Sequence, residues 1–167
     1  MSGRRKHYFP MFIDLTDKKA VVVGAGTIAK RRIRSLAEFT DRLVVIAPEV
    51  NRELKQMEEE GKITTLRKRY EREDIFDASL VIAATNDNKM NQEIYSACKC
   101  LGIPVNVCAD KTRCDFYFPG IVSNEDFVVG ISTRGRDHRK SREISGKIQK
   151  LLEEARTPEQ DKEERQE

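Results

Sequence analysis

Two glycines and an alanine, spaced Gly24-x-Gly26-x-x-Ala29, follow a short apolar run and open a stretch with helical periodicity. This spacing between a strand and a helix is typical of a dinucleotide-binding turn. Gly24 would permit the tight turn, Gly26 would let the backbone approach a pyrophosphate, and Ala29 would let the helix pack closely on the strand. The phosphates would face the first N–H groups of the helix, at Thr27 and Ile28. The pattern therefore predicts a bound dinucleotide.

A second group of candidates lies at the end of the apolar run 43–47. An acid that binds the ribose is expected about 20 residues past the glycines. Ala47 and Pro48 occupy that place, and Glu49 is the nearest carboxylate. No arginine stands at this strand end to hold a 2′-phosphate, which favours NAD over NADP without deciding between them.

A third group, Thr85-Asn86-Asp87, follows the apolar run 80–84. Thr85 and Asn86 fit contacts with the ribose or the nicotinamide, whereas Asp87 could simply cap the helix that follows. The predicted cofactor-binding residues are therefore Gly24, Gly26, Thr27, Ile28, Ala29, Ala47, Pro48, Glu49, Thr85 and Asn86.

The elements that must position these residues alternate between strands and helices. This alternation, with short loops, predicts an α/β fold with a Rossmann-like doubly wound parallel sheet and helices on both faces. Ligands in that fold bind at the carboxyl ends of the strands. We expect the aromatic segment 8–15 to lie against the sheet, and Ile75 and Phe76 to point inward from a loop or single turn. The predicted strands are 19–23, 43–47, 63–66, 80–84 and 104–108, and the predicted helices are 27–38, 49–60 and 88–101.

The pattern changes towards the carboxyl end. Two strand-like runs, 116–122 and 127–132, predict an antiparallel β-hairpin, which is marginal alone and should pair with another sheet, a second subunit being one candidate. A short helical segment over 141–155 and a charged tail, expected to be disordered, follow. The expected domains are an NAD-binding Rossmann domain (8–112), a β-hairpin dimerisation segment (113–134), a C-terminal helical segment (135–156) and the tail (157–167).

Length, charge and cysteine spacing limit the kinds of protein that this chain can be. The 167 residues suffice for one ordinary domain, alone or with a small appendage, and 35% of them are charged. No run of about 18 apolar residues is present, so we expect no membrane span and a cytoplasmic protein. The net charge of +3 is small and the basic residues are clustered, which favours an anionic ligand over nucleic acid. The four cysteines have neither disulfide nor metal spacing, so we expect reduced thiols and no metal site.

The order of the motifs resembles one family. The glycine turn is followed by Ile82-Ala83-Ala84-Thr85-Asn86-Asp87, then by Asn91, by Val105-Asn106-Val107, by Cys114-Asp115-Phe116-Tyr117-Phe118-Pro119 and by Ile131-Ser132-Thr133-Arg134-Gly135. The glycine motif is shared by many oxidoreductases, but the ordered set is specific. Over about residues 8–152 it is similar to the precorrin-2 dehydrogenase and sirohydrochlorin ferrochelatase family of siroheme biosynthesis.

This resemblance implies an NAD-dependent oxidation of the reduced tetrapyrrole precorrin-2 to sirohydrochlorin, by a homodimer joined through the part after the Rossmann domain. Some members of the family also insert the iron, so a bifunctional dehydrogenase and ferrochelatase is one alternative. A regulatory module that senses NAD without chemistry is another.

Asp110 is the candidate for acid–base catalysis. Removal of a hydride from a tetrapyrrole bridge must be matched by loss of a proton, which a positioned carboxylate can accept. The family usually carries an aspartate three residues after the position of Asn106, where this chain has Ala109. Either Asp110 takes its place through a one-residue shift in the loop, or the catalytic carboxylate is missing.

The substrate that the resemblance implies carries many carboxylates, which call for guanidinium and ammonium groups. The basic run 134–142 could bind them, although a solvated helix start is the alternative. The candidate substrate-binding residues are Asn106, Arg113, Thr133, Arg134, Arg136 and Arg139.

Overall fold

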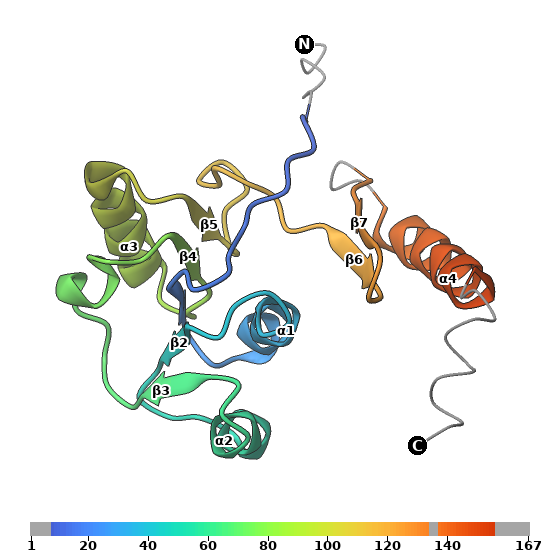
Figure 1. Ribbon diagram of the computed structural model, residues 1–167. Helices are drawn as coiled ribbons and strands as arrows, with labels where there is room; N and C mark the ends of the chain where they lie inside the picture. The colour runs from blue at the N-terminus through green and yellow to red at the C-terminus, as the bar shows by residue number, and fades with distance from the viewer. Residues whose placement is uncertain (1–7, 134–136, 156–167) are drawn as a thin grey trace, which may run out of the picture. The chain divides into compact units, whose positions relative to one another are not determined.

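The structure, a computed structural model, describes residues 8–133 and 137–155, without the side chain of His138 (Figure 1). The chain divides into two compact units. The larger unit is Phe12–Tyr117, and the smaller unit combines Met1–Met11 with Phe118–Glu167. Arg134, Arg136 and the tail 157–167 lie outside the described residues. No helix in the described ranges is long and apolar enough to cross a membrane.

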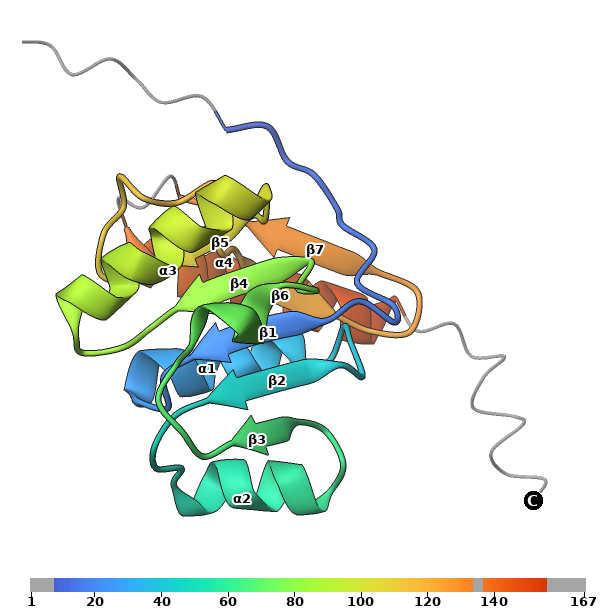
Figure 2. The same ribbon diagram turned by 90° about the vertical axis from the view of Figure 1, so that its left-hand side faces the viewer.

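A five-stranded parallel sheet forms the centre of the larger unit, in the order β3-β2-β1-β4-β5. The register places Val23 beside both Ile46 and Ala83, so three strands end at one edge. The order reverses between β1 and β4, which in open α/β sheets marks the crevice where ligands bind. The strands, which run side by side in Figure 2, are β1 (Ala20–Val23), β2 (Leu43–Ile46), β3 (Thr64–Leu66), β4 (Leu80–Ala83) and β5 (Val105–Val107).

Helices cover both faces of this sheet, with α1 and α3 on opposite sides (Figure 1). The doubly wound parallel fold predicted from the sequence is thereby confirmed. Every residue of β1 and β4 is buried, as expected of strands covered on both faces. The helical elements are α1 (Thr27–Leu36), α2 (Arg52–Glu59), the 3-10 helix η1 (Arg72–Ile75) and α3 (Asn88–Leu101).

Local signals set the helix ends. Asp87 caps α3 by accepting hydrogen bonds from the backbone N–H of Lys89 (2.8 Å) and Met90 (3.2 Å), and Gly102 ends the helix at φ +71°. Asn51 caps α2 through Leu54 N (3.1 Å). Helix α2 therefore begins three residues later than the sequence pattern suggested.

Two expectations about apolar side chains were wrong. The segment 8–15 was expected to lie against the sheet, but Phe12 and Ile13 are 73% and 51% exposed. Helices already cover both faces of the sheet (Figure 1), so the chain that precedes β1 finds no open face there. Phe76 is exposed while Ile75 is buried, because consecutive residues of a 3-10 turn point about 120° apart.

The smaller unit contains the predicted hairpin, formed by β6 (Gly120–Ser123) and β7 (Val128–Ile131), which are antiparallel. Asn124 closes the turn by accepting from Asp126 N (3.0 Å) and Phe127 N (2.8 Å). Helix α4 (His138–Glu154) packs on β6 at Gly120, where an added Cβ would lie 3.3 Å from the hydroxyl oxygens of two α4 serines. Strand β6 was predicted to start at residue 116, but it starts at Gly120, directly after Pro119.

Candidate functional site

A cleft of about 680 Å³ lies at the carboxyl edge of the sheet. This volume falls within the range of small-molecule and cofactor sites. Four segments and one helical residue line it: 23–26, 46–51, 68–70, 84–87 and Met90. Seven of the residues predicted to bind the cofactor share this lining: Gly24, Gly26, Ala47, Pro48, Glu49, Thr85 and Asn86.

The two glycines of the turn have different roles. Gly24 has φ +114°, and a Cβ at this position would lie 2.4 Å from the carbonyl oxygen of Ala84. Glycine is therefore required there by both conformation and space. Gly26 has φ −72°, and a Cβ added to it would meet nothing within 4 Å. The turn thus leaves open space above Gly26, where a diphosphate can approach the backbone.

Helix α1 begins directly at this space. Gly26 is its N-cap, no side chain caps the helix, and its first turn contains no acidic residue. The first N–H groups, at Thr27 and Ile28, and the positive end of the helix dipole favour an anion there. Ala29 is fully buried, as close helix–strand packing requires. The residues present therefore fit the diphosphate of a dinucleotide.

At the end of β2, Ala47 is buried and its N–H donates to Leu66 O (3.2 Å), which ties the strand end to β3. Pro48 and Glu49 are exposed and border the cleft. Glu49 is thus the carboxylate that this strand end offers to a bound nucleotide.

Buried Asn91 of α3 holds the loop after β4. Its Oδ1 accepts from the N–H (3.2 Å) and the hydroxyl (2.8 Å) of Thr85, and its Nδ2 donates to Thr85 O (3.0 Å). Asn91 is only 2% exposed, so these bonds form away from solvent. Sequence reasoning assigned Asn91 no role, although a polar residue in register with buried Ile94 and Cys98 of the same helix is the signal that would have found it.

Asp110 lies in the loop after β5 and does not line the cleft described above. Its Oδ1 accepts from the hydroxyl (2.6 Å) and the N–H (2.9 Å) of Thr112, and Arg113 Nε lies 3.4 Å from Oδ2. The Thr112 side chain first, then the Thr112 backbone, and more weakly Arg113 hold the pKa of Asp110 below its ordinary value of 3.8. Asp110 is therefore an ionised carboxylate at neutral pH, as a proton acceptor must be.

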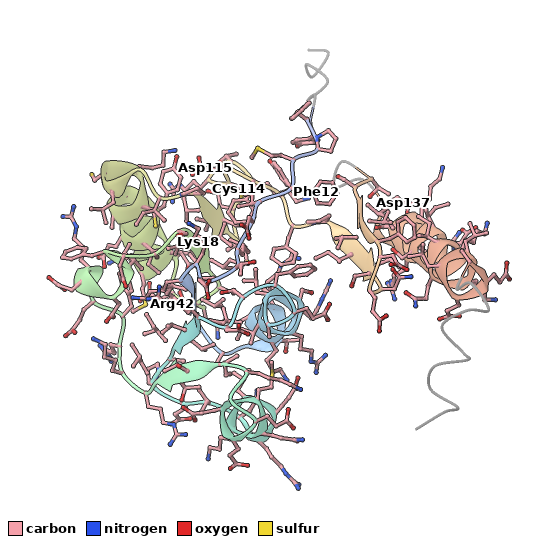
Figure 3. The ribbon with its side chains drawn as sticks, in the orientation of Figure 1. Phe12, Lys18, Arg42, Cys114, Asp115 and Asp137 are labelled. Carbon is pink, nitrogen blue, oxygen red and sulfur yellow. The ribbon has the colours of Figure 1, made fainter. Side chains whose placement is uncertain are left out.

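Asn106 and Asp115 hold the segment 113–116 along the outer edge of β5. Asn106 is 6% exposed, and its Nδ2 donates to Phe116 O (2.9 Å). Asp115 accepts from Val105 N (3.1 Å) and pairs with Lys99 (2.8 Å). Figure 3 shows Cys114 and Asp115 together in this region, where Cys114 bridges Asn106 in antiparallel pairing. Asn106, a predicted substrate-binding residue, thus uses its amide nitrogen to bind a backbone carbonyl.

The remaining candidate substrate-binding residues within the described ranges are divided between the two units. Arg113 pairs with Asp110 in the larger unit. Thr133 and Arg139 belong to the smaller unit, and the arginine side chain is exposed. The backbone N–H of Arg139 donates to the N-cap Asp137 at 2.9 Å, and Asp137 is labelled in Figure 3.

All four cysteines are free thiols. Burial raises the pKa of Cys98 to about 12 and also raises the pKa values of Cys108 and Cys114, with Arg32 opposing the shift at Cys108. Neutral, partly buried thiols behave as small apolar groups, as the sequence suggested for Cys98, which lies in the core.

Comparison with known proteins agrees with this geometry. Residues 11–120 match the family model described as "Putative NAD(P)-binding". The chain is 38% identical over 144 residues to the "Probable multifunctional siroheme biosynthesis protein HemA" of Ruminiclostridium josui, an alignment that covers 86% of this chain and 28% of the relative. It is 32% identical to the siroheme synthase of Psychrobacter sp. (strain PRwf-1), covering 86% of this chain and 30% of the relative. The chain thus spans about three tenths of these relatives.

A solved structure is similar over most of the chain. This structure is described as "SirC, precorrin-2 dehydrogenase", and it matches with a TM-score of 0.67 and 26% identity. The match covers 86% of this chain and 71% of that one. Phe12–Tyr117 accounts for less than two thirds of the 167 residues, so the similarity extends beyond the larger unit.

Proposed function

Because the chain belongs to the NAD(P)-binding family whose model its residues 11–120 match, we propose that it is an NAD-dependent dehydrogenase that converts precorrin-2 to sirohydrochlorin. The observation that carries the proposal is the similarity to SirC, precorrin-2 dehydrogenase, over 86% of the chain. The siroheme synthases among its relatives support the same pathway.

NAD⁺, when bound, supplies the acceptor for the hydride. The backbone at Gly24, Gly26, Thr27 and Ile28 would hold its diphosphate against the start of α1, where the open space above Gly26 fits it. Thr85 and Asn86 would contact the ribose or nicotinamide, and Asn91 would fix Thr85 through three hydrogen bonds.

Asp110 would accept the proton that must leave precorrin-2 when a hydride is removed. The carboxylate is ionised at neutral pH and can therefore take the proton, while its lowered pKa makes it a weaker base than an ordinary aspartate. Exposed carboxylates of the substrate would be bound by cationic and polar groups. These groups are Asn106, Arg113, Thr133, Arg134, Arg136 and Arg139.

The test is an anaerobic assay in which purified protein is mixed with precorrin-2 and NAD⁺ while NADH and sirohydrochlorin are followed by absorbance. Asp110→Asn should abolish turnover while the Kd for NAD⁺ changes by less than about threefold. Near-normal turnover of this variant would remove Asp110 from the mechanism. Binding of NAD⁺ by the unaltered protein without any product would instead favour a sensing module.

The same assay with Fe²⁺ and sirohydrochlorin tests the second candidate function, a bifunctional dehydrogenase and ferrochelatase. The observation that favours it is the similarity to siroheme synthases and to a relative described as multifunctional. Formation of siroheme would establish the chelatase, and its absence beside an active dehydrogenase would exclude it.

We also propose a homodimer that works in the cytoplasm. Within the described residues, β6 and β7 pair only with each other, and a two-stranded hairpin is marginal unless something else pairs with it. Four free thiols fit a reducing compartment. Light scattering after gel filtration tests the dimer, because a monomeric mass at working concentration would contradict it.

A further inference from the structure

The segment 68–70, which follows β3, borders the cofactor cleft next to the end of β2. Strands β2 and β3 are neighbours, with Ile46 opposite Leu66. The N–H of Ala47 and the N–H of Lys68 both donate to Leu66 O, at 3.2 and 2.9 Å. The residues after β2 and those after β3 therefore begin at the same point of the sheet edge and line one cleft.

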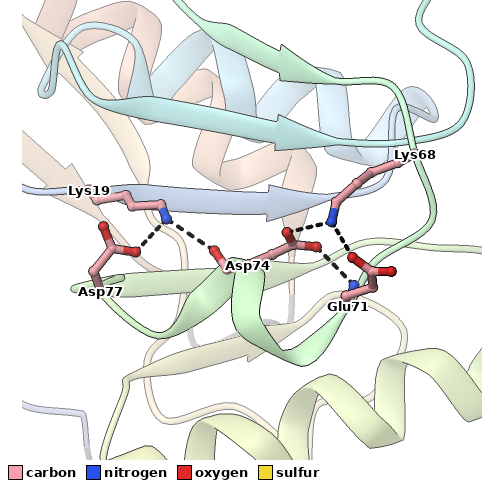
Figure 4. A network of polar contacts seen from close by, with 5 residues as sticks. All are labelled: Lys19, Lys68, Glu71, Asp74 and Asp77. Atoms are coloured by element: carbon pink, nitrogen blue, oxygen red, sulfur yellow. Dashed lines mark hydrogen bonds and ion pairs between the residues drawn. The ribbon is translucent and has the colours of Figure 1, made fainter.

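A polar network fixes the first residue of this segment (Figure 4). Lys68 Nζ lies 2.5 Å from Glu71 Oε2 and 2.9 Å from Asp74 Oδ1. Asp74 also accepts from the N–H of Glu71 (2.8 Å), and its carbonyl accepts from Lys19 Nζ (3.1 Å), which pairs with Asp77 as well. The charge of Lys68 is therefore neutralised within the protein.

The last residue of the segment is fixed by packing, since Tyr70 lies against the apolar core beneath α3. Arg69 stands between these two anchored residues. It is exposed, it lines the cleft, and the described residues offer it no carboxylate within ion-pair distance. By contrast, Arg67 pairs with Glu58 at 2.8 Å. Arg69 is thus a cation held at the cleft with its charge available to a ligand.

We propose that Arg69 binds the 2′-phosphate of NADP, so that the chain accepts NADP as well as NAD. In dinucleotide-binding folds, an acid near the end of β2 binds the free ribose hydroxyl, whereas a nearby arginine accommodates the 2′-phosphate. Here Glu49 and Arg69 border the same cleft from adjacent strands. A guanidinium is suited to a phosphate because it offers several donors in a fixed plane. The inference rests on the proposed use of this cleft by the cofactor.

The experiment measures the Kd values of NAD⁺ and NADP⁺ by isothermal titration calorimetry on the full chain. The wild type should bind both nucleotides. Arg69→Gln should weaken the binding of NADP⁺ by about tenfold or more, because NADP⁺ carries the 2′-phosphate. The same substitution should weaken the binding of NAD⁺, which lacks this phosphate, by less than about threefold. Glu49→Gln should strengthen the binding of NADP⁺, since it removes a negative charge that repels the 2′-phosphate. Arg72→Gln is the matched control: it removes the same charge from a residue outside the cleft and should change neither affinity.

An equal loss of both affinities in Arg69→Gln, with an unchanged unfolding transition, would overturn the inference. So would a wild type that binds NAD⁺ but not NADP⁺, a result that leaves the proposed function standing. A wild type that binds neither nucleotide would overturn the cofactor assignment itself, and the inference with it.

Discussion

At Asp110, two hydrogen bonds from Thr112 and the weaker influence of Arg113 keep the carboxylate ionised. A group whose pKa is lowered on folding stabilises the folded state above its ordinary pKa, and this contribution is lost as the pH falls through the folded value. Thr112→Val removes the hydroxyl donor and keeps the backbone donor. The pKa of Asp110 should therefore rise, and NMR titration of the labelled carboxyl carbon measures it.

Thr112→Ser is the control for this prediction because it retains the hydroxyl. The acid limb of the turnover profile should move to higher pH in Thr112→Val and stay in place in Thr112→Ser. An unchanged carboxyl titration in Thr112→Val would mean that the hydroxyl does not set the charge of Asp110.

Gly24 and Gly26 form a second test at the scale of single residues. Gly24→Ala introduces a Cβ into a backbone carbonyl at φ +114° and should cost about 3 kcal/mol or more of unfolding free energy. Gly26→Ala adds its methyl to open space at an allowed φ, so stability should change by less than about 1 kcal/mol. The same methyl group should weaken the binding of NAD⁺ by about tenfold or more, because it occupies the place of the diphosphate.

Urea denaturation and calorimetric titration separate the two effects. The assignment of the glycines would be wrong if Gly26→Ala bound NAD⁺ normally, or if Gly24→Ala were as stable as the wild type.

At the scale of elements, Asn91 joins α3 to the loop after β4. Asn91→Ala leaves the N–H and the carbonyl of Thr85 without their partner and should cost about 2–3 kcal/mol of stability. The affinity for NAD⁺ should fall as well, because Thr85 and Asn86 line the cleft. Gln92→Ala, at the exposed neighbouring position, is the control and should change stability by less than about 0.5 kcal/mol. Equal effects of the two substitutions would refute the role of Asn91.

The elements themselves were largely predictable because their signals are local. The bounds of α3 follow from Asp87 before it and Gly102 after it, and the buried strands stand out as unbroken apolar runs. Features that depend on the order of strands were not predictable. Arg69 is distant from Glu49 in sequence and shares its cleft only because β3 pairs with β2. For the same reason, the sequence could not show that the apolar segment 8–15 finds no open face on the sheet.

At the scale of the whole molecule, the residues that line the cofactor cleft all belong to one unit. The residues that line the cleft lie between Val23 and Met90, and the last strand of the parallel sheet, β5, ends at Val107. The hairpin and α4, together with the candidate Thr133 and Arg139, belong to the other unit. Nucleotide binding should therefore depend on the larger unit alone, whereas the residues proposed to bind the substrate are divided between the two units.

A chain that stops after Tyr117 tests this division. It retains every strand of the parallel sheet and every residue of the cleft, so it should bind NAD⁺ within about threefold of the full chain. It keeps Asn106 and Arg113 but lacks the other four groups proposed to bind the substrate carboxylates, so it should not oxidise precorrin-2. The missing groups are Thr133, Arg134, Arg136 and Arg139. Calorimetry and the absorbance assay measure the two properties, with circular dichroism to verify the fold. A folded fragment that had lost NAD⁺ binding would show that residues beyond Tyr117 complete the cofactor site.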